Sequence, residues 1–386
     1  MKRYLILLLL ATFSIISCVK DSPPSPPKTP EHTVFMYMPW SNLVSYFRQN
    51  IADIETAIEK NILGNNRFIV FFMSSPTRAT LFELKYKKGT CVRDTLDEYV
   101  YTDPVFTTAA GITSILNDVI DIAPANRYSM IISSHGMAWI PVSASRTRGF
   151  KQKEYWEYEG VPSTRWFGGT SSEHQVDITT LAEGITAAGI KMEYILFDDC
   201  YMSSIEVAYD LKEVAHYLIG CPTEIMAYGF PYAIITPHLI GNVDYHNLCN
   251  DFIAFYENYS TPCGTIGVTD CSQVENLALV MKEINRQYPF DPALLNSIQR
   301  MCGYSPVRFF DLGDYVSKLC PDGNLLSVFK AQLERTVPLR GHTAEYYSAS
   351  IGSVPIQSYS GVTTSDPSTS PSTSLKTETA WYKATH

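Results

Sequence analysis

Two apolar segments of the chain each end in a residue that could take part in nucleophilic chemistry. Residues 130–134 are followed by His135 and Gly136, and residues 194–198 are followed two positions later by Cys200. The carboxyl ends of parallel strands meet at one edge of an open sheet, so an imidazole and a thiol in these places could meet. An imidazole can take the thiol proton and leave a thiolate nucleophile, which is the chemistry that a cysteine peptidase uses.

The residues around Cys200 and His135 suggest how such a reaction would be supported. A helix is predicted from Tyr201 to Val214, and a thiol at a helix amino terminus lies near the positive end of the helix dipole, which favours the thiolate. Gly136 has no side chain, so its N–H can approach a substrate carbonyl and hold an oxyanion, with the Cys200 N–H as a second donor. A cysteine in such a place is more often an inert buried residue, so the prediction depends on His135 lying at the same height.

The elements that position these residues alternate between buried strands and amphipathic helices. Strands are predicted at residues 32–38, 68–73, 128–134, 193–199, 217–221 and 265–270. Helices are predicted at residues 50–63, 109–122, 179–188, 201–214, 248–256, 272–288 and 325–336. This alternation predicts βαβ units, and therefore an α/β fold with a mostly parallel sheet covered on both faces. The aromatic residues near Trp381 are expected to dock back onto the body of the protein.

Composition and cysteine usage exclude several classes of protein. The chain has 386 residues with 45% hydrophobic residues, enough for a sizeable core, and its net charge of −9 argues against nucleic acid as a partner. Setting aside Cys18 and Cys200 leaves seven cysteines, an odd number without C-x-x-C spacing. Neither a disulfide framework nor a zinc site is therefore predicted.

The amino terminus has the pattern of an export signal. A basic start precedes an apolar stretch at residues 4–16 that is too short to span a membrane, and the stretch ends close to Cys18. This ending resembles the bacterial lipobox, in which the cysteine is lipidated; an ordinary signal peptide with a chance cysteine is the alternative. We predict a signal peptide at 1–17, a Pro/Ser-rich tether at 18–31, and one peptidase domain at 32–386, held at the outer membrane or cell surface.

Two motifs then carry a resemblance to a known family. Ser134-His135-Gly136, together with the pattern D-x-C-x-M-x-x-x-E that begins at Asp198, resembles the clostripain family of cysteine peptidases, family C11 of the caspase-like clan. Segments 37–43 and 223–232 extend this resemblance over most of the chain. It implies a caspase-like three-layer α-β-α fold and a His/Cys dyad that acts on protein or peptide substrates. His135 would be the base or proton donor, and Cys200 would be the nucleophile that forms an acyl-enzyme.

The resemblance also implies a specificity for basic side chains. The family places an acidic residue two positions before the cysteine in the S1 pocket, where it selects Arg or Lys at P1, and Asp198 matches that position. A carboxylate there would make a charge-assisted contact with a guanidinium or ammonium group; the alternative is a strand-end carboxylate with no substrate role. Relatives with this specificity carry a second acidic residue where this chain has Tyr228. The nearby Glu224 is therefore the second S1 candidate.

The family resemblance also bears on proteolytic processing and on a cofactor. Several relatives are cut after a basic residue between the histidine and cysteine strands, which predicts self-cleavage near Arg146–Lys153. Clostripain responds to calcium, but the chain has no D-x-D-x-D-G loop, so no cofactor is predicted.

The leading prediction is therefore a monomeric, exported, lipid-anchored cysteine endopeptidase that cleaves after Arg or Lys. The alternative from another class is a catalytically silent surface lipoprotein that binds peptides or glycans on a peptidase scaffold. The presence of both His135 and Cys200 argues against it. A serine hydrolase that uses Ser133 or Ser134 lacks the G-x-S-x-G elbow.

Overall fold

A nine-stranded sheet runs through the protein, and its order among the described strands is β10-β8-β7-β6-β5-β1-β2-β3-β4. The computed structural model describes residues 29–142 and 167–386. The strands are β1 (His32–Met38), β2 (Arg67–Ser75), β3 (Arg78–Lys87), β4 (Thr90–Val100), β5 (Arg127–Ser133), β6 (Met192–Asp198), β7 (Ala215–Gly220), β8 (Thr265–Asp270) and β10 (Leu339–His342).

The centre of the sheet is parallel and its two sides are antiparallel. β1 pairs in parallel with β2 and β5, and β6 pairs in parallel with β5 and β7, which confirms the predicted parallel core. β3 and β4 form an antiparallel hairpin on β2. On the other side of the sheet, β8 pairs antiparallel with β7, and β10 pairs antiparallel with β8. The hairpin was not among the predicted elements because β4 is mostly exposed and polar, so it lacks the apolar run of a buried strand.

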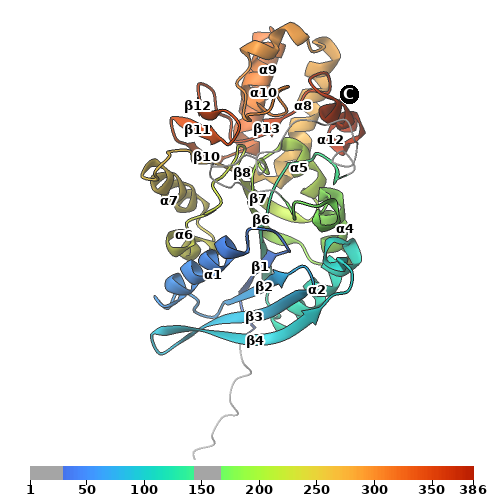
Figure 1. Ribbon diagram of the computed structural model, residues 1–386. Coiled ribbons are helices and arrows are strands. Elements are labelled where there is room, and N and C mark those ends of the chain that lie inside the picture. Colours follow the sequence, from blue (N-terminus) through green and yellow to red (C-terminus); the bar gives the residue numbers. More distant parts are fainter. Residues whose placement is uncertain (1–28, 143–166) are drawn as a thin grey trace, which may run out of the picture.

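Helices cover both faces of the sheet, as Figure 1 shows. One face carries α1 (Val44–Ile58), α6 (Tyr232–Leu239) and α7 (Tyr245–Glu257), which pack against one another. The other face carries α2 (Ala109–Ile122), α4 (Ile178–Ala187), α5 (Ile205–Leu211), α8 (Val274–Gln287) and α12 (Ala380–Thr385). This arrangement is the expected three-layer α-β-α fold.

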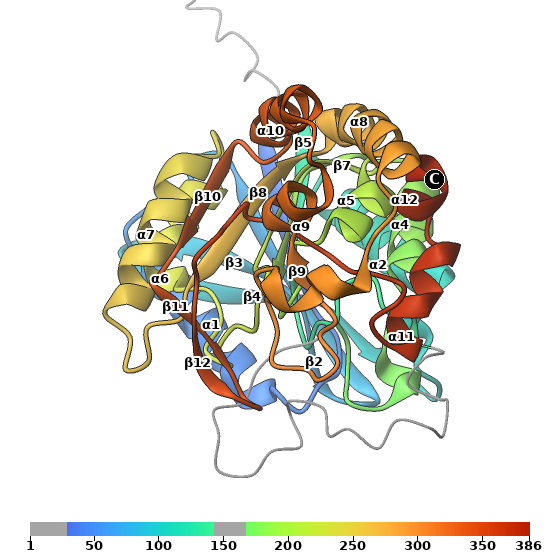
Figure 2. The ribbon, with the colours of Figure 1, turned by 90° about the horizontal axis from the view of Figure 1, so that it is seen from above.

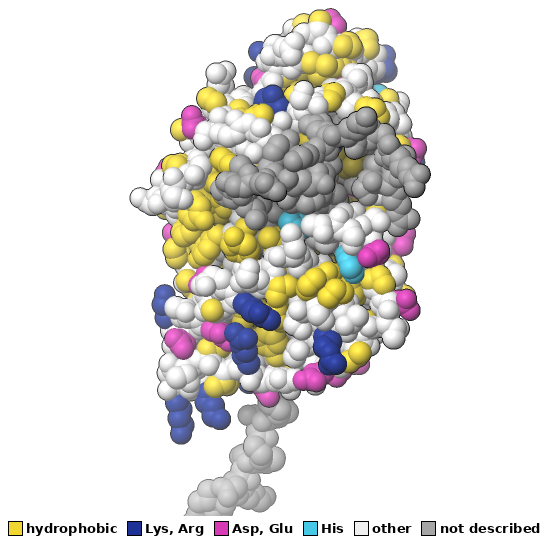
Figure 3. All heavy atoms as spheres, in the orientation of Figure 1, with side chains coloured by type: hydrophobic (Ala, Val, Ile, Leu, Met, Phe, Trp, Pro, Cys, Tyr) yellow, Lys and Arg dark blue, Asp and Glu magenta, His cyan; other side chains and the backbone are white. Residues whose placement is uncertain are grey.

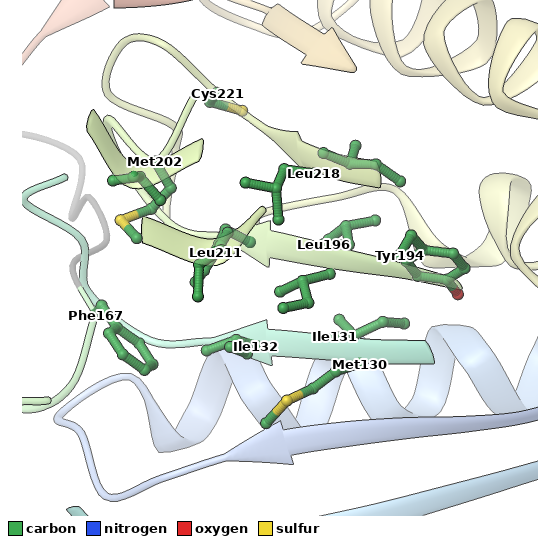
Figure 4. Close-up of a cluster of buried hydrophobic side chains, with 14 of the residues drawn as sticks. Met130, Ile131, Ile132, Phe167, Tyr194, Leu196, Met202, Leu211, Leu218 and Cys221 are labelled. Atoms are coloured by element: carbon green, nitrogen blue, oxygen red, sulfur yellow. The ribbon is translucent and has the colours of Figure 1, made fainter. Parts of the chain in front are cut away.

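The core lies between these layers and contains the two strands that lead to His135 and Cys200. Figure 4 shows Ile131 and Ile132 of β5 beside Leu196 of β6 and Leu218 of β7. Ile131, Ile132 and Leu196 have no exposed surface. A strand covered by helices on both faces needs apolar residues at every position, which explains the continuous apolar runs in the sequence.

The segment after Cys200 differs from its prediction. A helix was expected from Tyr201, but α5 begins only at Ile205 and ends at Leu211. Before the helix, Ser204 forms a β-bridge with Thr363, and the Thr363 N–H donates to the Ser203 carbonyl at 2.9 Å. These contacts with a distant part of the chain hold the backbone extended. The expectation that Cys200 begins a helix and lies at its dipole was therefore wrong.

The carboxyl-terminal part of the chain packs beyond the β8 side of the sheet and over its carboxyl edge (Figure 2). It includes α9 (Leu312–Leu319), α10 (Gly323–Thr336), and a hairpin of β11 (Glu345–Ser348) and β12 (Gly352–Pro355). Trp381 of α12 is only 2% exposed, and its ring meets that of Tyr209 on α5 at 5.7 Å. The predicted docking of this tail onto the body is confirmed.

On the outer surface, charges of both signs are interspersed over the region of β3 and β4, at the lower end of Figure 3. Lys85, for example, lies within 3.0 Å of both Glu83 and Asp94. None of the described helices has both the length and the apolar character needed to cross a lipid bilayer. The predicted signal peptide, Cys18, most of the tether and the predicted cleavage region Arg146–Lys153 lie outside the described residues.

Candidate active site

The ends of β5 and β6 bring His135 and Cys200 to the same edge of the sheet. Ser133 of β5 pairs in register with Asp198 of β6, and His135 and Cys200 each follow two residues later. The two loops touch, because a Cβ atom added to Gly136 would overlap the carbonyl oxygen of Cys200. Gly136 is therefore needed for this close approach of two backbones. The two strand ends converge as the sequence suggested, while the catalytic roles of the residues remain predictions.

The His135 ring is buried and oriented by a residue from a distant turn. Its Nε2 lies 2.6 Å from the side-chain oxygen of Asn42, just before α1. An amide oxygen only accepts hydrogen bonds, so Nε2 carries a proton and Nδ1 is the nitrogen able to take one from a thiol. The His135 N–H donates to the Gly168 carbonyl at 3.2 Å, which fixes the backbone as well. The sequence places Asn42 within segment 37–43 of the family resemblance, which assigns it no role.

The Cys200 side chain is fully buried and contacts the segment after β7. The Ile225 N–H lies 3.3 Å from Sγ and donates to it, and Sγ is 3.7 Å from the Ile225 carbonyl oxygen. A backbone N–H that points at sulfur stabilises a thiolate more than a thiol, because the bond to a charged acceptor is stronger. The thiol in turn donates to the Ile225 carbonyl, so the sulfur lies between a backbone donor and a backbone acceptor of one residue, in place of the helix terminus expected from the sequence.

Asp199 ties the two loops together directly. Its Oδ1 accepts hydrogen bonds from the Ser134 N–H at 2.5 Å and from the Ser134 hydroxyl at 3.1 Å. Ser134 immediately precedes His135, and Asp199 immediately precedes Cys200. This contact therefore links the loop of the candidate base to the loop of the candidate nucleophile. No sequence signal distinguished this contact from an ordinary strand-end carboxylate.

Asp198, the first S1 candidate, is a buried carboxylate at the end of β6. It accepts hydrogen bonds from the Phe230 N–H at 3.0 Å, the Tyr232 hydroxyl at 3.1 Å and the Ser133 hydroxyl at 3.2 Å. These donors offset the cost of burying its charge. The carboxylate is thus held in a fixed orientation two residues before Cys200, and its role in binding substrate stays a prediction.

Glu224, the second S1 candidate, contacts Tyr201 and the β11–β12 hairpin. Its carboxylate accepts hydrogen bonds from the Tyr201 hydroxyl at 2.6 Å, the Ser348 hydroxyl at 2.5 Å and the Ala349 N–H at 2.9 Å. Burial, and then the charge of Glu224, raise the pKa of Tyr201 well above its ordinary value, so the hydroxyl stays protonated and donates. Its assignment to substrate binding likewise stays a prediction.

The oxyanion donors named from the sequence were the N–H groups of Gly136 and Cys200, and these remain predictions. The next N–H along, that of Tyr201, donates to the Thr223 carbonyl at 3.0 Å and is occupied. Burial raises the pKa of the nearby Cys221 thiol well above its usual value, which makes it an unreactive core residue. Within residues 29–142 and 167–386, no group of His, Cys, Asp and Glu side chains could hold a metal ion.

Comparisons with known proteins agree with this geometry. The model of the clostripain family, Peptidase_C11, matches residues 36–288. A secreted C11 cysteine protease from Bacteroides thetaiotaomicron, iotapain, is 60% identical with a TM-score of 0.86, over 93% of this chain and 100% of that chain. The comparison with curated proteins gave no match.

Two further solved structures are similar. A clostripain from Bacteroides thetaiotaomicron ATCC 29148, in complex with the peptide inhibitor BTN-VLTK-AOMK, is 62% identical with a TM-score of 0.57, over 57% of this chain and 99% of that chain. An inactive zymogen C11 protease from Parabacteroides distasonis is 25% identical with a TM-score of 0.76, over 93% of this chain and 99% of that chain. The converging ends of β5 and β6, the three-layer fold and these matches agree with one another. The chain belongs to the clostripain family of C11 cysteine peptidases.

Proposed function

We propose that this peptidase is an exported, lipid-anchored endopeptidase that cleaves peptide bonds after Lys or Arg, with His135 and Cys200 as its dyad. The observation that carries the proposal is the register of β5 and β6, because the two residues each follow the paired ends of these adjacent strands by two positions. Both residues come from one sheet of one chain, so we expect a monomer to hold a complete site.

The proposed reaction follows from the roles of the two side chains. Nδ1 of His135 takes the proton from the Cys200 thiol, and the thiolate attacks the scissile carbonyl carbon to form a C–S bond. The N–H groups of Gly136 and Cys200 hold the resulting oxyanion. His135 returns its proton to the leaving amine as the C–N bond breaks, which leaves a thioester. Water then gives a proton to His135 and attacks the thioester, which releases the carboxylic acid product and the thiol.

A buried carboxylate beside the nucleophile supports the proposed preference for basic P1 residues. Asp198 is fully buried two residues before Cys200, so a Lys or Arg side chain that reached it would make a strong charge-assisted contact. The 62%-identical clostripain binds an inhibitor whose peptide, VLTK, ends in lysine. Glu224 is the second proposed contributor of negative charge in this region.

Turnover of fluorogenic peptide amides with Lys, Arg or Gln at P1 tests this function. We expect cleavage after Lys and Arg that iodoacetamide and the substitution Cys200→Ala both abolish. Asp198→Asn should lower kcat/KM for the basic substrates by about 10- to 100-fold, the worth of a hydrogen bond to a charged group. Turnover that survives alkylation would refute the cysteine mechanism, and equal cleavage after Gln would refute the specificity.

The proposed lipid anchor has a separate test. Its support is the sequence of residues 1–18, with a basic start, a short apolar stretch and Cys18. Cells that express the full chain or its Cys18→Ala variant would be fed an alkyne-tagged fatty acid and then fractionated. We expect label and membrane association for the unmodified chain only. Label on both chains, or on neither, would refute the anchor at this residue.

A further inference from the structure

The residue that follows the candidate nucleophile has an unfavourable backbone conformation. Tyr201 has a φ of +63°, in the left-handed region that residues with bulky side chains rarely adopt. Its side chain is also completely buried. Such a conformation costs free energy and persists only where surrounding contacts impose it, and it often occurs beside a reacting group. The turn at residues 200–201 must therefore be held by specific partners.

Three successive residues after β7 supply those partners. The Thr223 carbonyl accepts from the Tyr201 N–H at 3.0 Å, and the Glu224 carboxylate accepts from the Tyr201 hydroxyl at 2.6 Å. The Ile225 N–H donates to the Cys200 sulfur at 3.3 Å. The same short segment thus holds the backbone of the turn, its buried side chain and the sulfur atom itself.

Glu224 is in turn fixed from its other side by the β11–β12 hairpin. The Ser348 hydroxyl and the Ala349 N–H both donate to its carboxylate. The Tyr201 ring packs against Phe309, with ring centroids 4.9 Å apart, so it can hardly turn away from Glu224. The carboxylate is therefore a rigid acceptor in a nearly dry environment, where a hydrogen bond from a hydroxyl is strong.

We propose that Tyr201 and Glu224 are positioning residues for the nucleophile. Their hydrogen bond keeps the turn in its left-handed conformation and so keeps the Cys200 sulfur against the Ile225 N–H and at the height of His135. This inference rests on the proposed role of Cys200, and it gives Glu224 a function different from substrate binding. The two functions predict different kinetics, because a lost S1 carboxylate raises KM for basic substrates, whereas a displaced sulfur lowers kcat.

The main test is Tyr201→Phe, with Tyr209→Phe as its matched control. The Tyr209 hydroxyl also donates to a glutamate, Glu275 at 2.9 Å, but does so on the outer side of α5. In Tyr201→Phe we expect kcat to fall by about 10- to 100-fold for both Lys and Arg substrates, as a misplaced reacting group would cause. KM should stay within about twofold of the unmodified enzyme, and Tyr209→Phe should keep both constants.

The rate of Cys200 alkylation by iodoacetamide gives a readout that a merely structural role would not change. The rate is measured by peptide mass spectrometry on samples that circular dichroism shows to be folded. Because iodoacetamide has no P1 side chain, its reaction does not depend on substrate binding in S1. We expect slower alkylation of Cys200 in Tyr201→Phe and in Glu224→Gln than in Tyr209→Phe. Wild-type alkylation rates and kcat in folded Tyr201→Phe would overturn the proposal. So would a rise in KM alone for Glu224→Gln.

This design separates the positioning proposal from the proposed function. Normal thiol-dependent turnover in both the unmodified enzyme and Tyr201→Phe would refute the positioning role and leave the peptidase function intact. An unmodified enzyme without turnover would refute the function, while the alkylation rates would still decide whether Tyr201 controls the sulfur.

Discussion

The hydrogen bond between Asn42 and His135 determines which nitrogen of the imidazole can act as a base. Asn42 accepts at 2.6 Å from Nε2, so the neutral ring presents Nδ1 as its acceptor. Loss of this partner would remove the acceptor that holds the proton on Nε2 and would leave the ring less well oriented. If the base is correctly oriented for only a fraction of the time, kcat falls in proportion to that fraction.

Asn42→Ala should therefore lower kcat by about 10- to 100-fold with little change in KM. The measurement is steady-state turnover of a Lys substrate, and Asn276→Ala, on the exposed surface of α8, is the control. A kcat equal to that of the unmodified enzyme would show that the hydrogen bond has no role in orienting the base.

His32 provides a pH prediction for stability instead of catalysis. Its Nδ1 accepts from the Gly241 N–H at 3.1 Å, and its Nε2 lies 2.8 Å from the Ser129 hydroxyl, so the ring is built into the fold as a neutral group. Burial, and next the charge of Arg127, lower its pKa from 6.5 to about 4. Between these pH values the unfolded chain binds a proton that the folded chain does not.

The free energy of unfolding should therefore fall as the pH falls from about 6.5 to about 4, by up to about 3 kcal/mol from this residue. Asp210, whose pKa burial raises to about 6, acts in the opposite direction in the same range. Urea unfolding of the unmodified chain and of His32→Gln isolates the histidine, because both contain Asp210. Parallel pH profiles for the two chains would contradict the prediction.

Single residues differ in how far the sequence could predict them. His135 and Cys200 were found because each follows a buried apolar run, a pattern that both identifies a strand and places its end. Asn42 and Ile225 could not be found in this way. Their contacts depend on where the turn before α1 and the segment after β7 lie relative to the site, which only tertiary packing decides.

Among the elements, local spacing displaced the start of two helices, α5 and α1, by four residues or more. The apolar spacing after Cys200 suggested a helix from Tyr201, yet the bridge between Ser204 and Thr363 delays α5 to Ile205. The α1 prediction began six positions late, because Val44–Gln49 contains mostly polar or exposed residues. Long-range pairing and solvent-exposed turns are features that periodicity does not capture.

A buried ion pair joins the carboxyl-terminal tail to the start of α5. Lys376 Nζ lies 3.0 Å from Glu206 Oε1, with side-chain exposures of 7% and 0%. Glu206 also accepts from the hydroxyls of Ser204 and Thr364. The glutamate that ends the D-x-C-x-M-x-x-x-E pattern thus has a structural reason for its place, since it binds the tail to the helix that follows the Cys200 turn.

Lys376→Met should destabilise the protein by about 3–5 kcal/mol, because it leaves the Glu206 charge buried without its cation. The exposed Lys383 on α12 offers the control Lys383→Met, which should change stability little. The double variant Glu206→Gln/Lys376→Met should recover most of the loss. Urea unfolding measures all three, and equal stability of the two single variants would contradict this account.

For the molecule as a whole, the parallel centre of the sheet was predictable from the sequence, but the short late strands β10, β11 and β12 were not. Continuous apolar runs fix the strands of the centre, but β10 and the β11–β12 hairpin are short and only partly buried. The hairpin nevertheless reaches the site, since Ser348 and Ala349 bind Glu224. Further along the chain, Ser365 accepts a hydrogen bond from the Trp139 indole at 3.0 Å. The hairpin and Ser365 both lie beyond residues 36–288, where the family model matches.

The position of a covalent label on the intact protein tests directly whether Cys200 and His135 form the catalytic dyad. A peptide ketone electrophile with Lys at P1 would be incubated with the unmodified chain, with Cys200→Ala and with His135→Ala, and the adduct mapped by mass spectrometry. We expect one adduct, on the Cys200 sulfur, which is lost in Cys200→Ala and forms far more slowly in His135→Ala. An adduct on another cysteine, or equal labelling without His135, would contradict this expectation.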